Sequence, residues 1–178
     1  RALLADGLRD GIGSDQFWCA WQPQVGPQGL PLGVEVLLRW DHPDLGGVSP
    51  GEFIPVAEDT GLVVPMGLSV LTHACQTLAR WAQSPLTRDL TVSMNVSARQ
   101  LHEGDFPAQV ERVLAETHAP AARLVLELTE SMVLQGADLV GRRLAALAAL
   151  GVRLSMDDFG TGYSSLALLK RLPLSEVK

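Results

Sequence analysis

The sequence is poor in cysteine, in aromatic side chains and in basic charge. Its 178 residues include two cysteines, and aromatic residues make up 5% of the chain. Cys19 and Cys75 form no CxxC pair and have no histidine at ligand spacing, which argues against a disulfide framework or a zinc site and predicts reduced, buried thiols. Fourteen basic residues against 20 acidic ones give a net charge of −6. No basic surface for duplex nucleic acid is therefore expected.

Long apolar runs are absent as well. No run reaches the roughly 18 residues that a membrane span needs, and the first ten residues lack the apolar block of a signal peptide. Hydrophobic residues nevertheless make up 47% of the chain, enough to bury a sizeable core. We expect one soluble, cytoplasmic domain. Because the chain starts without Met and stops at Lys178 inside a strand-like run, we expect it to be a piece of a longer protein.

Helical and strand patterns alternate along the chain. The spacing of apolar residues predicts a helix over about residues 3–12, a second from Ser49-Pro50, and others over residues 63–83, 106–117 and 138–150. Six strand patterns lie between them, over residues 17–22, 33–40, 90–95, 124–128, 152–157 and 174–178. Alternating strands and helices indicate parallel βαβ units with both sheet faces covered. An α/β barrel that lacks its last strands fits this count best, because a complete one needs about 250 residues.

Polar residues sit in or directly after these apolar strands. They are Glu35, Asn95, Glu127, Asp157 and Asp158. The carboxyl ends of parallel barrel strands meet on one face, where active sites lie. Four carboxylates and an amide oxygen are hard donors suited to magnesium or manganese, and two such ions activate water for phosphoryl chemistry. The alternative is that the acids pair with interior arginines such as Arg39 and Arg153.

A glycine-rich loop, Phe159–Ser165, follows the fifth of these strand patterns. Gly160 and Gly162 would let backbone N–H groups approach a phosphate, although an ordinary loop has the same composition. Arg39 and Lys178 are candidate phosphate contacts at strand ends, with a surface role as the alternative.

A set of separated motifs resembles the EAL-domain cyclic di-GMP phosphodiesterases. The motifs occur in the family's order and close to its spacing, from about residue 3 to the last residue. They are WQPQV (21–25), EVLLRW (35–40), HPDLGGVSPGEFIPVAEDTGL (42–62), MNVSARQ (94–100), LELTES (126–131), DDFGTGYSSL (157–166) and LPLSEVK (172–178). The resemblance implies an EAL-type (β/α)8 TIM-like barrel with one antiparallel strand, spanning residues 1–178 and cut off before its C-terminal strands.

The resemblance also implies roles for individual residues. Glu35, Asn95, Glu127 and Asp157 correspond to metal ligands and Asp158 to a ligand of a second metal, with two Mg²⁺ or Mn²⁺ ions in the family. Lys178 resembles the active-site lysine near the reacting water or phosphate, so that Glu35, Lys178, Asp157 and Asp158 are the implied catalytic set. Gln22 and Arg39 resemble ligand-binding positions. Glu130 corresponds to the glutamate that anchors the 159–165 loop, which in the family bears on metal binding and dimerisation.

The implied reaction is hydrolysis of the bacterial second messenger cyclic di-GMP to linear pGpG. The implied partners are a second copy in a homodimer and a covalently linked upstream sensory or GGDEF-type domain. Two departures stand out: the signature reads Glu35-Val36-Leu37 instead of Glu-Ala-Leu, and the family's general-base glutamate lies beyond Lys178. We therefore expect activity in the intact parent but not in this fragment. The alternative is an inactive EAL domain that binds cyclic di-GMP as a receptor.

Overall fold

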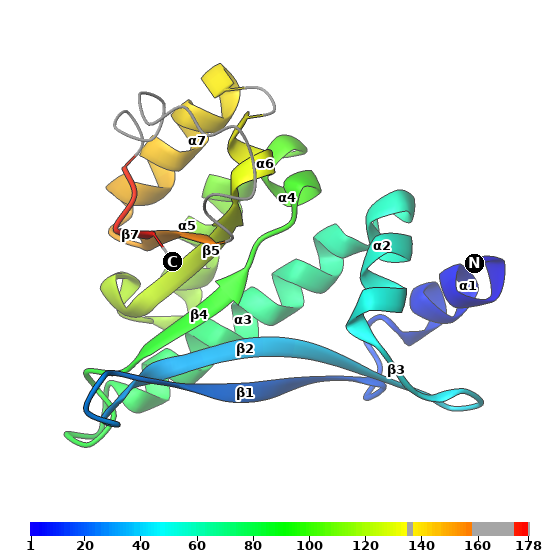
Figure 1. Cartoon of the computed structure of the whole chain (residues 1–178), viewed down its shortest axis with the longest axis horizontal. Coiled ribbons are helices and arrows are strands. Elements are labelled where there is room, and N and C mark those ends of the chain that lie inside the picture. The colour runs from blue at the N-terminus through cyan, green and yellow to red at the C-terminus, as the bar shows by residue number, and fades with distance from the viewer. Residues whose placement is uncertain (135–136, 158–172, 178) are drawn as a thin grey trace.

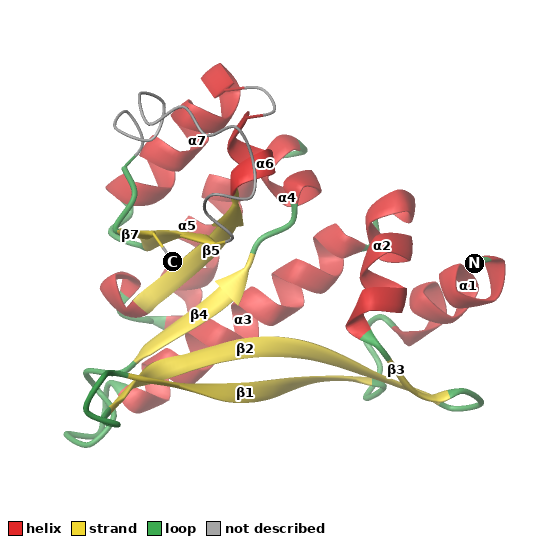
Figure 2. Cartoon of the chain, viewed as in Figure 1, coloured by secondary structure: helices red, strands yellow, loops and turns green. Residues whose placement is uncertain are grey.

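The protein is built on one mixed β-sheet. The computed structural model describes residues 1–134, 137–157 and 173–177, and within them the sheet has seven strands (Figures 1 and 2). The strands are β1 (Phe17–Val25), β2 (Pro31–His42), β3 (Gly46–Val48), β4 (Thr91–Asn95), β5 (Leu124–Thr129), β6 (Arg153–Asp157) and β7 (Glu176–Val177). Their order is β1-β2-β4-β5-β6-β7, with β3 paired to β2 beside this path. β1 and β3 run antiparallel to β2, and the other neighbours are parallel.

Helices connect the parallel strands and cover one face of the sheet. The described helices are α1 (Ala2–Gly11), α2 (Pro50–Thr60), α3 (Val63–Trp81), α4 (Ala98–His102), α5 (Phe106–Thr117), the 3-10 turn η1 (Ala121–Arg123), α6 (Glu130–Leu134) and α7 (Ala137–Ala149). The helices α3, α5 and α7 pack side by side; in Figure 1 α3 passes behind β2 and β4, and α7 lies above β6 and β7. This is the crossover arrangement that parallel strands require.

The two faces of the central strands differ in character. Alternate residues such as Val36, Met94, Leu126 and Met156 point into a continuous apolar core beneath α3, α5 and α7. Because successive side chains of a strand point to opposite faces, Glu35, Ser93, Asn95 and Glu127 occupy the other face. The apolar core between the sheet and these helices therefore stabilises the domain, while the opposite face of the sheet carries the polar residues.

A second, aromatic cluster fixes α1 and α2 against the carboxyl end of β2. Trp40 is 1% exposed and stacks on Phe17 with 5.3 Å between ring centroids, and it meets Phe53 of α2 edge-on at 5.8 Å. Leu8 of α1 is fully buried in the same cluster. Such aromatic pairs add about 0.5–1.5 kcal/mol each beyond area burial, so α2 is held firmly beside the strand that carries Glu35.

The sequence predictions for the elements are largely confirmed. The predicted helix over residues 106–117 has the bounds of α5, and Ser49-Pro50 does begin α2, with Ser49 N donating to Glu52 Oε2 at 3.3 Å. Two strand predictions were too short: β1 continues through Pro23 to Val25, and β2 runs from Pro31 to His42 instead of over residues 33–40. The described part of the sheet places β1 at an edge, the kind of strand in which proline is tolerated.

Four short elements were not predicted. They are β3, α4, η1 and α6; with β3, the described sheet has seven strands where six were expected. Each has five residues or fewer, too short for a hydrophobic period to show. Among the described residues no single helix is long and apolar enough to cross a membrane; α2 and α3 reach that length and composition only together, across a bend of 119°.

Candidate functional site

Glu35 of β2 and Asn95 at the carboxyl end of β4 meet on one face of the sheet. Asn95 Nδ2 donates a hydrogen bond to Glu35 Oε1 at 2.7 Å, across 60 residues of sequence. In the β2–β4 ladder Glu35 is paired with Ser93, so Asn95 lies two residues further along the strand direction than Glu35. The contact confirms that two of the predicted donors come together.

Glu127 is the third residue of this group. It lies opposite Asn95 in the β4–β5 ladder, on the same face of the sheet, and its side chain is 2% exposed. A carboxylate so far from water is costly unless it is paired or bound to a cation. Glu35, Asn95 and Glu127 therefore form a row of oxygen-bearing side chains across three adjacent strands, which we call the oxygen row.

The backbone of Asp157 continues this row onto β6. Asp157 is level with Thr129, two residues beyond Glu127, at the last position of its strand. The predicted residues Asp158 and Lys178, like the loop 159–165, lie outside the described residues, so their predicted roles stay predictions. Glu130, the predicted loop anchor, begins α6 directly after β5 and is 7% exposed.

The described residues contain no group of three or more His, Cys, Asp or Glu side chains arranged to hold a metal ion. The oxygen row itself has two carboxylates and one amide, so it would need further donors from the end of β6 or beyond. Its chemistry fits a hard cation: donation by Asn95 Nδ2 to Glu35 leaves the amide oxygen Oδ1 as an acceptor, and no histidine or thiol joins the row.

Gln22 and Arg39 flank the oxygen row on the β1 side. Gln22 is exposed and lies directly opposite Glu35 in the antiparallel β1–β2 ladder. Arg39 lies four residues beyond Glu35 on the same face of β2 and is half-buried. Its Nη1 donates to the backbone oxygen of Leu38 at 3.0 Å, whereas the hydrogen-bond partner of Glu35 is Asn95. Arg39 therefore leaves most of its donors for a ligand.

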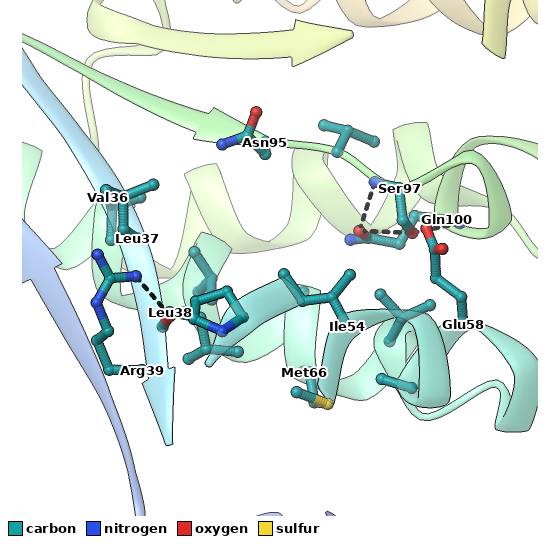
Figure 3. A pocket seen from close by; sticks show the side chains of 16 residues that line it. Val36, Leu37, Leu38, Arg39, Ile54, Glu58, Met66, Asn95, Ser97 and Gln100 are labelled. Carbon is teal, nitrogen blue, oxygen red and sulfur yellow. Dashed lines mark hydrogen bonds between the residues drawn. The ribbon is translucent and has the colours of Figure 1, made fainter. Parts of the chain in front are cut away.

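An apolar cavity opens beside these residues, between the carboxyl end of β2 and the helices α2 and α3 (Figure 3). It has a volume of about 200 Å³, and Arg39 and Asn95 stand at its edge. Its walls are mostly aliphatic, with Val36, Ile54 and Met66 among them. A mostly apolar cavity with a few polar groups at its edge is typical of sites for small organic ligands.

Three polar residues that line this cavity, Glu58, Ser97 and Gln100, were not predicted. Glu58 comes from the end of α2, and Gln100 comes from α4. The signal for Gln100 was present in the sequence: Ser97-Ala-Arg-Gln100 is a capping box, in which the first serine and the glutamine three positions later cap a helix. No sequence signal marks Glu58, because only the bend between α2 and α3 places it opposite Gln100.

The chain matches a known family over nearly its whole length. The model of the EAL domain family matches residues 5–178. The chain therefore belongs to the EAL domain family, an α/β fold of the TIM-barrel type, and the predicted family and fold class are confirmed.

Relatives within this family carry cyclic di-GMP phosphodiesterase names. The chain is 43% identical, over 99% of its length, to the bifunctional diguanylate cyclase/cyclic di-GMP phosphodiesterase MucR of Pseudomonas aeruginosa, of which it covers 26%. It is 39% identical to a second cyclic di-GMP phosphodiesterase of that organism, of which it covers 30%. The chain thus spans only about a quarter to a third of the length of these curated relatives.

Solved structures that resemble this chain also carry phosphodiesterase or EAL-domain names. The MucR phosphodiesterase in complex with c-di-GMP is 41% identical, with a TM-score of 0.93 over 98% of this chain and 71% of that one. The FimX EAL domain of P. aeruginosa bound to c-di-GMP has a TM-score of 0.86 at 20% identity, which is a likeness of fold alone.

Proposed function

We propose that this domain hydrolyses one phosphodiester bond of cyclic di-GMP to give linear pGpG, with Mg²⁺ or Mn²⁺. The observation that carries the proposal is the oxygen row beside the apolar cavity. It joins hard donors for a cation to a site for a base in a chain that is 41% identical to a phosphodiesterase solved with c-di-GMP. The proposal concerns the domain within its whole protein.

Glu35, Asn95 and Glu127 would hold the divalent ions together with Asp157 and Asp158. The hydrogen bond from Asn95 Nδ2 fixes the orientation of both side chains, so that the amide oxygen and the second carboxylate oxygen need little rearrangement on binding. When bound, a pair of such ions lowers the pKa of a water molecule and stabilises charge on the phosphoryl oxygens.

The remaining residues bind and orient the substrate. Arg39 offers guanidinium donors at the edge of the cavity, where they suit a phosphate oxygen. Gln22 stands across the ladder from Glu35 and would contact the ligand from the β1 side. Lys178 is proposed to contact the reacting water or phosphate, and Glu130 to anchor the 159–165 loop.

The same proposal extends to the partners of the domain. MucR combines a cyclase and a phosphodiesterase name in one protein of which this chain covers 26%. We propose a GGDEF-type or sensory domain upstream in the parent of this chain, a cytoplasmic location, and a homodimer whose contact depends on the 159–165 loop.

The test is incubation of the whole protein with cyclic di-GMP and Mg²⁺, followed by chromatographic detection of the linear dinucleotide. Appearance of pGpG that stops on addition of EDTA is the expected result. Tight binding of cyclic di-GMP without any product would identify the receptor alternative. Absence of both binding and product would contradict the proposal.

A further inference from the structure

Ser155 of β6 carries a buried hydroxyl group without a hydrogen-bond partner. The residue is 0% exposed, and its Oγ has no partner among the described residues. A buried hydroxyl that bonds to nothing destabilises a folded protein, and alanine would fill nearly the same space without that cost. The position therefore points to an acceptor that the hydroxyl serves when the domain works.

Ser155 belongs to the polar face of the sheet. Its chain neighbours Leu154 and Met156 are both fully buried in the main apolar core. Because successive side chains of a strand point to opposite faces, Ser155 points to the face that carries the oxygen row. It is paired with Glu127 in the β5–β6 ladder, and on its other side with the backbone of Glu176 in the β6–β7 ladder. Ser155 and Glu127 are thus neighbours on the same face of adjacent strands.

Glu127 can accept a further hydrogen bond from this side. It has a partner in this structure, but a carboxylate has about four lone-pair positions. On its β4 side the paired residue is Asn95, whose Nδ2 donates to Glu35. On its β6 side the paired residue is Ser155. The Ser155 hydroxyl is therefore a donor beside Glu127 that is engaged with no other described residue.

A second serine shows the same placement with a bonded hydroxyl. Ser93 of β4 is 2% exposed and is paired with Glu35 in the β2–β4 ladder. Its Oγ donates to Gln24 Oε1 of β1 at 3.3 Å. Both serines thus lie beside a glutamate of the oxygen row, but the Ser93 hydroxyl is already used within the sheet. The contrast assigns to Ser155 a role that Ser93 does not have.

We propose that Ser155 is a positioning residue of the divalent-ion site. Its Oγ–H donates to one carboxylate oxygen of Glu127 and leaves the other oxygen for the ion. Such a bond fixes the orientation of the ligating carboxylate and so raises the affinity for the ion. Ser155 itself touches neither the ion nor the substrate. The inference rests on the proposed function, since it assumes that Glu127 is a metal ligand.

The experiment compares Ser155→Ala with Ser93→Ala in the whole protein. Mg²⁺ affinity is measured by titration calorimetry without substrate, and Tm is measured in EDTA. Ser155→Ala should lower the Mg²⁺ affinity about tenfold or more, whereas its Tm in EDTA should not fall, because its Oγ makes no bond among the described residues. Ser93→Ala is the matched control. It should keep the Mg²⁺ affinity but lower the Tm, since Gln24 Oε1 loses its donor.

The other outcomes separate the two levels of the argument. Equal Mg²⁺ affinity in the wild type and Ser155→Ala would overturn the positioning role and leave the proposed function standing. An equal loss of affinity in both variants would assign the effect to packing on this face and would overturn the role as well. A wild-type protein that binds neither Mg²⁺ nor Mn²⁺ would contradict the proposed function and this inference with it.

Discussion

At the scale of single residues, the oxygen row shows how a polar side chain is tolerated within an apolar strand. Glu35 directly precedes Val36, which is 2% exposed and belongs to the main core. The alternation of the strand sends one side chain to the core and the other to the site. The Glu35–Asn95 bond then offsets part of the desolvation of the carboxylate. The Glu-Val-Leu departure from the family signature therefore changes the packing side of the strand, not the side that bears the site.

Replacing Glu35 by alanine should abolish hydrolysis of cyclic di-GMP. The change removes a proposed metal ligand and the acceptor of Asn95 Nδ2, and even the loss of a group one shell farther from a metal costs about 10–100-fold. We expect a loss of more than about 100-fold in kcat, measured by pGpG formation. Glu111→Ala removes an exposed carboxylate of α5 and should leave kcat unchanged. Substantial turnover by Glu35→Ala would remove Glu35 from the metal site.

The buried thiol of Cys75 gives a prediction about pH. Burial raises the pKa of Cys75 to about 12, with an opposing, smaller contribution from a hydrogen bond with Thr117. The folded state thus favours the neutral thiol. Its contribution to stability is fully present below the ordinary pKa of 9.0 and is lost as the pH rises towards 12. Chemical denaturation between pH 8 and about 11 should show a shallower loss of stability in Cys75→Ala than in the wild type, and equal slopes would contradict the assignment.

At the scale of elements, the site depends on how closely β2 and β4 approach. Gly33 of β2 is level with Thr91, and a Cβ atom there would lie 2.3 Å from the Thr91 backbone oxygen. Backbone atoms do not move aside as a flexible side chain does. The glycine two residues before Glu35 therefore allows the ladder that brings Glu35 to Asn95.

Gly33→Ala should accordingly destabilise the domain and weaken the site at once. We expect a loss of about 2 kcal/mol or more in the free energy of unfolding, together with weaker Mg²⁺ binding, because β2 must shift away from β4. Denaturant titration and metal titration by calorimetry measure the two effects. Gly47→Ala, where the nearest contact is 3.6 Å away and φ is not positive, serves as the control and should change both values little.

At the scale of the whole molecule, parallel strands and their register gather distant residues at one end of the sheet. In the strand ladders, Asn95 of β4 lies two positions beyond the residue paired with Glu35 of β2. Glu127 of β5 is paired with Asn95, and the backbone of Asp157 on β6 lies two positions beyond the residue paired with Glu127. This stagger is the shear that closes a tilted barrel. The oxygen row therefore depends on the register of β2, β4, β5 and β6 and is sensitive to any change in it.

Binding of Mg²⁺ should stabilise the whole domain through this row. An ion that binds only the folded state adds about 2.7 kcal/mol at a concentration 100 times its Kd, which would raise Tm by several degrees in a domain of this size. Calorimetry of the whole protein with and without Mg²⁺ tests this. The shift should vanish in Glu35→Ala but persist in Glu111→Ala. A Mg²⁺ effect of equal size in all three proteins would locate the ion elsewhere.

The local pattern of the chain was sufficient to determine the main helices and strands, the cap at Ser49, the family and the identity of Glu35, Asn95 and Glu127 as candidate donors. These features depend on short-range periodicity and on residue types, which are visible in a single sequence. The contact between Glu35 and Asn95 was decided by the tertiary structure alone, since it depends on the register between strands 60 residues apart. The same holds for the cavity, where the bend after α2 and the missing side chain of Gly67 bring Glu58 and Gln100 into one space. The positions of these two side chains depend on packing between segments that are distant in the sequence, and no local sequence pattern predicts that packing.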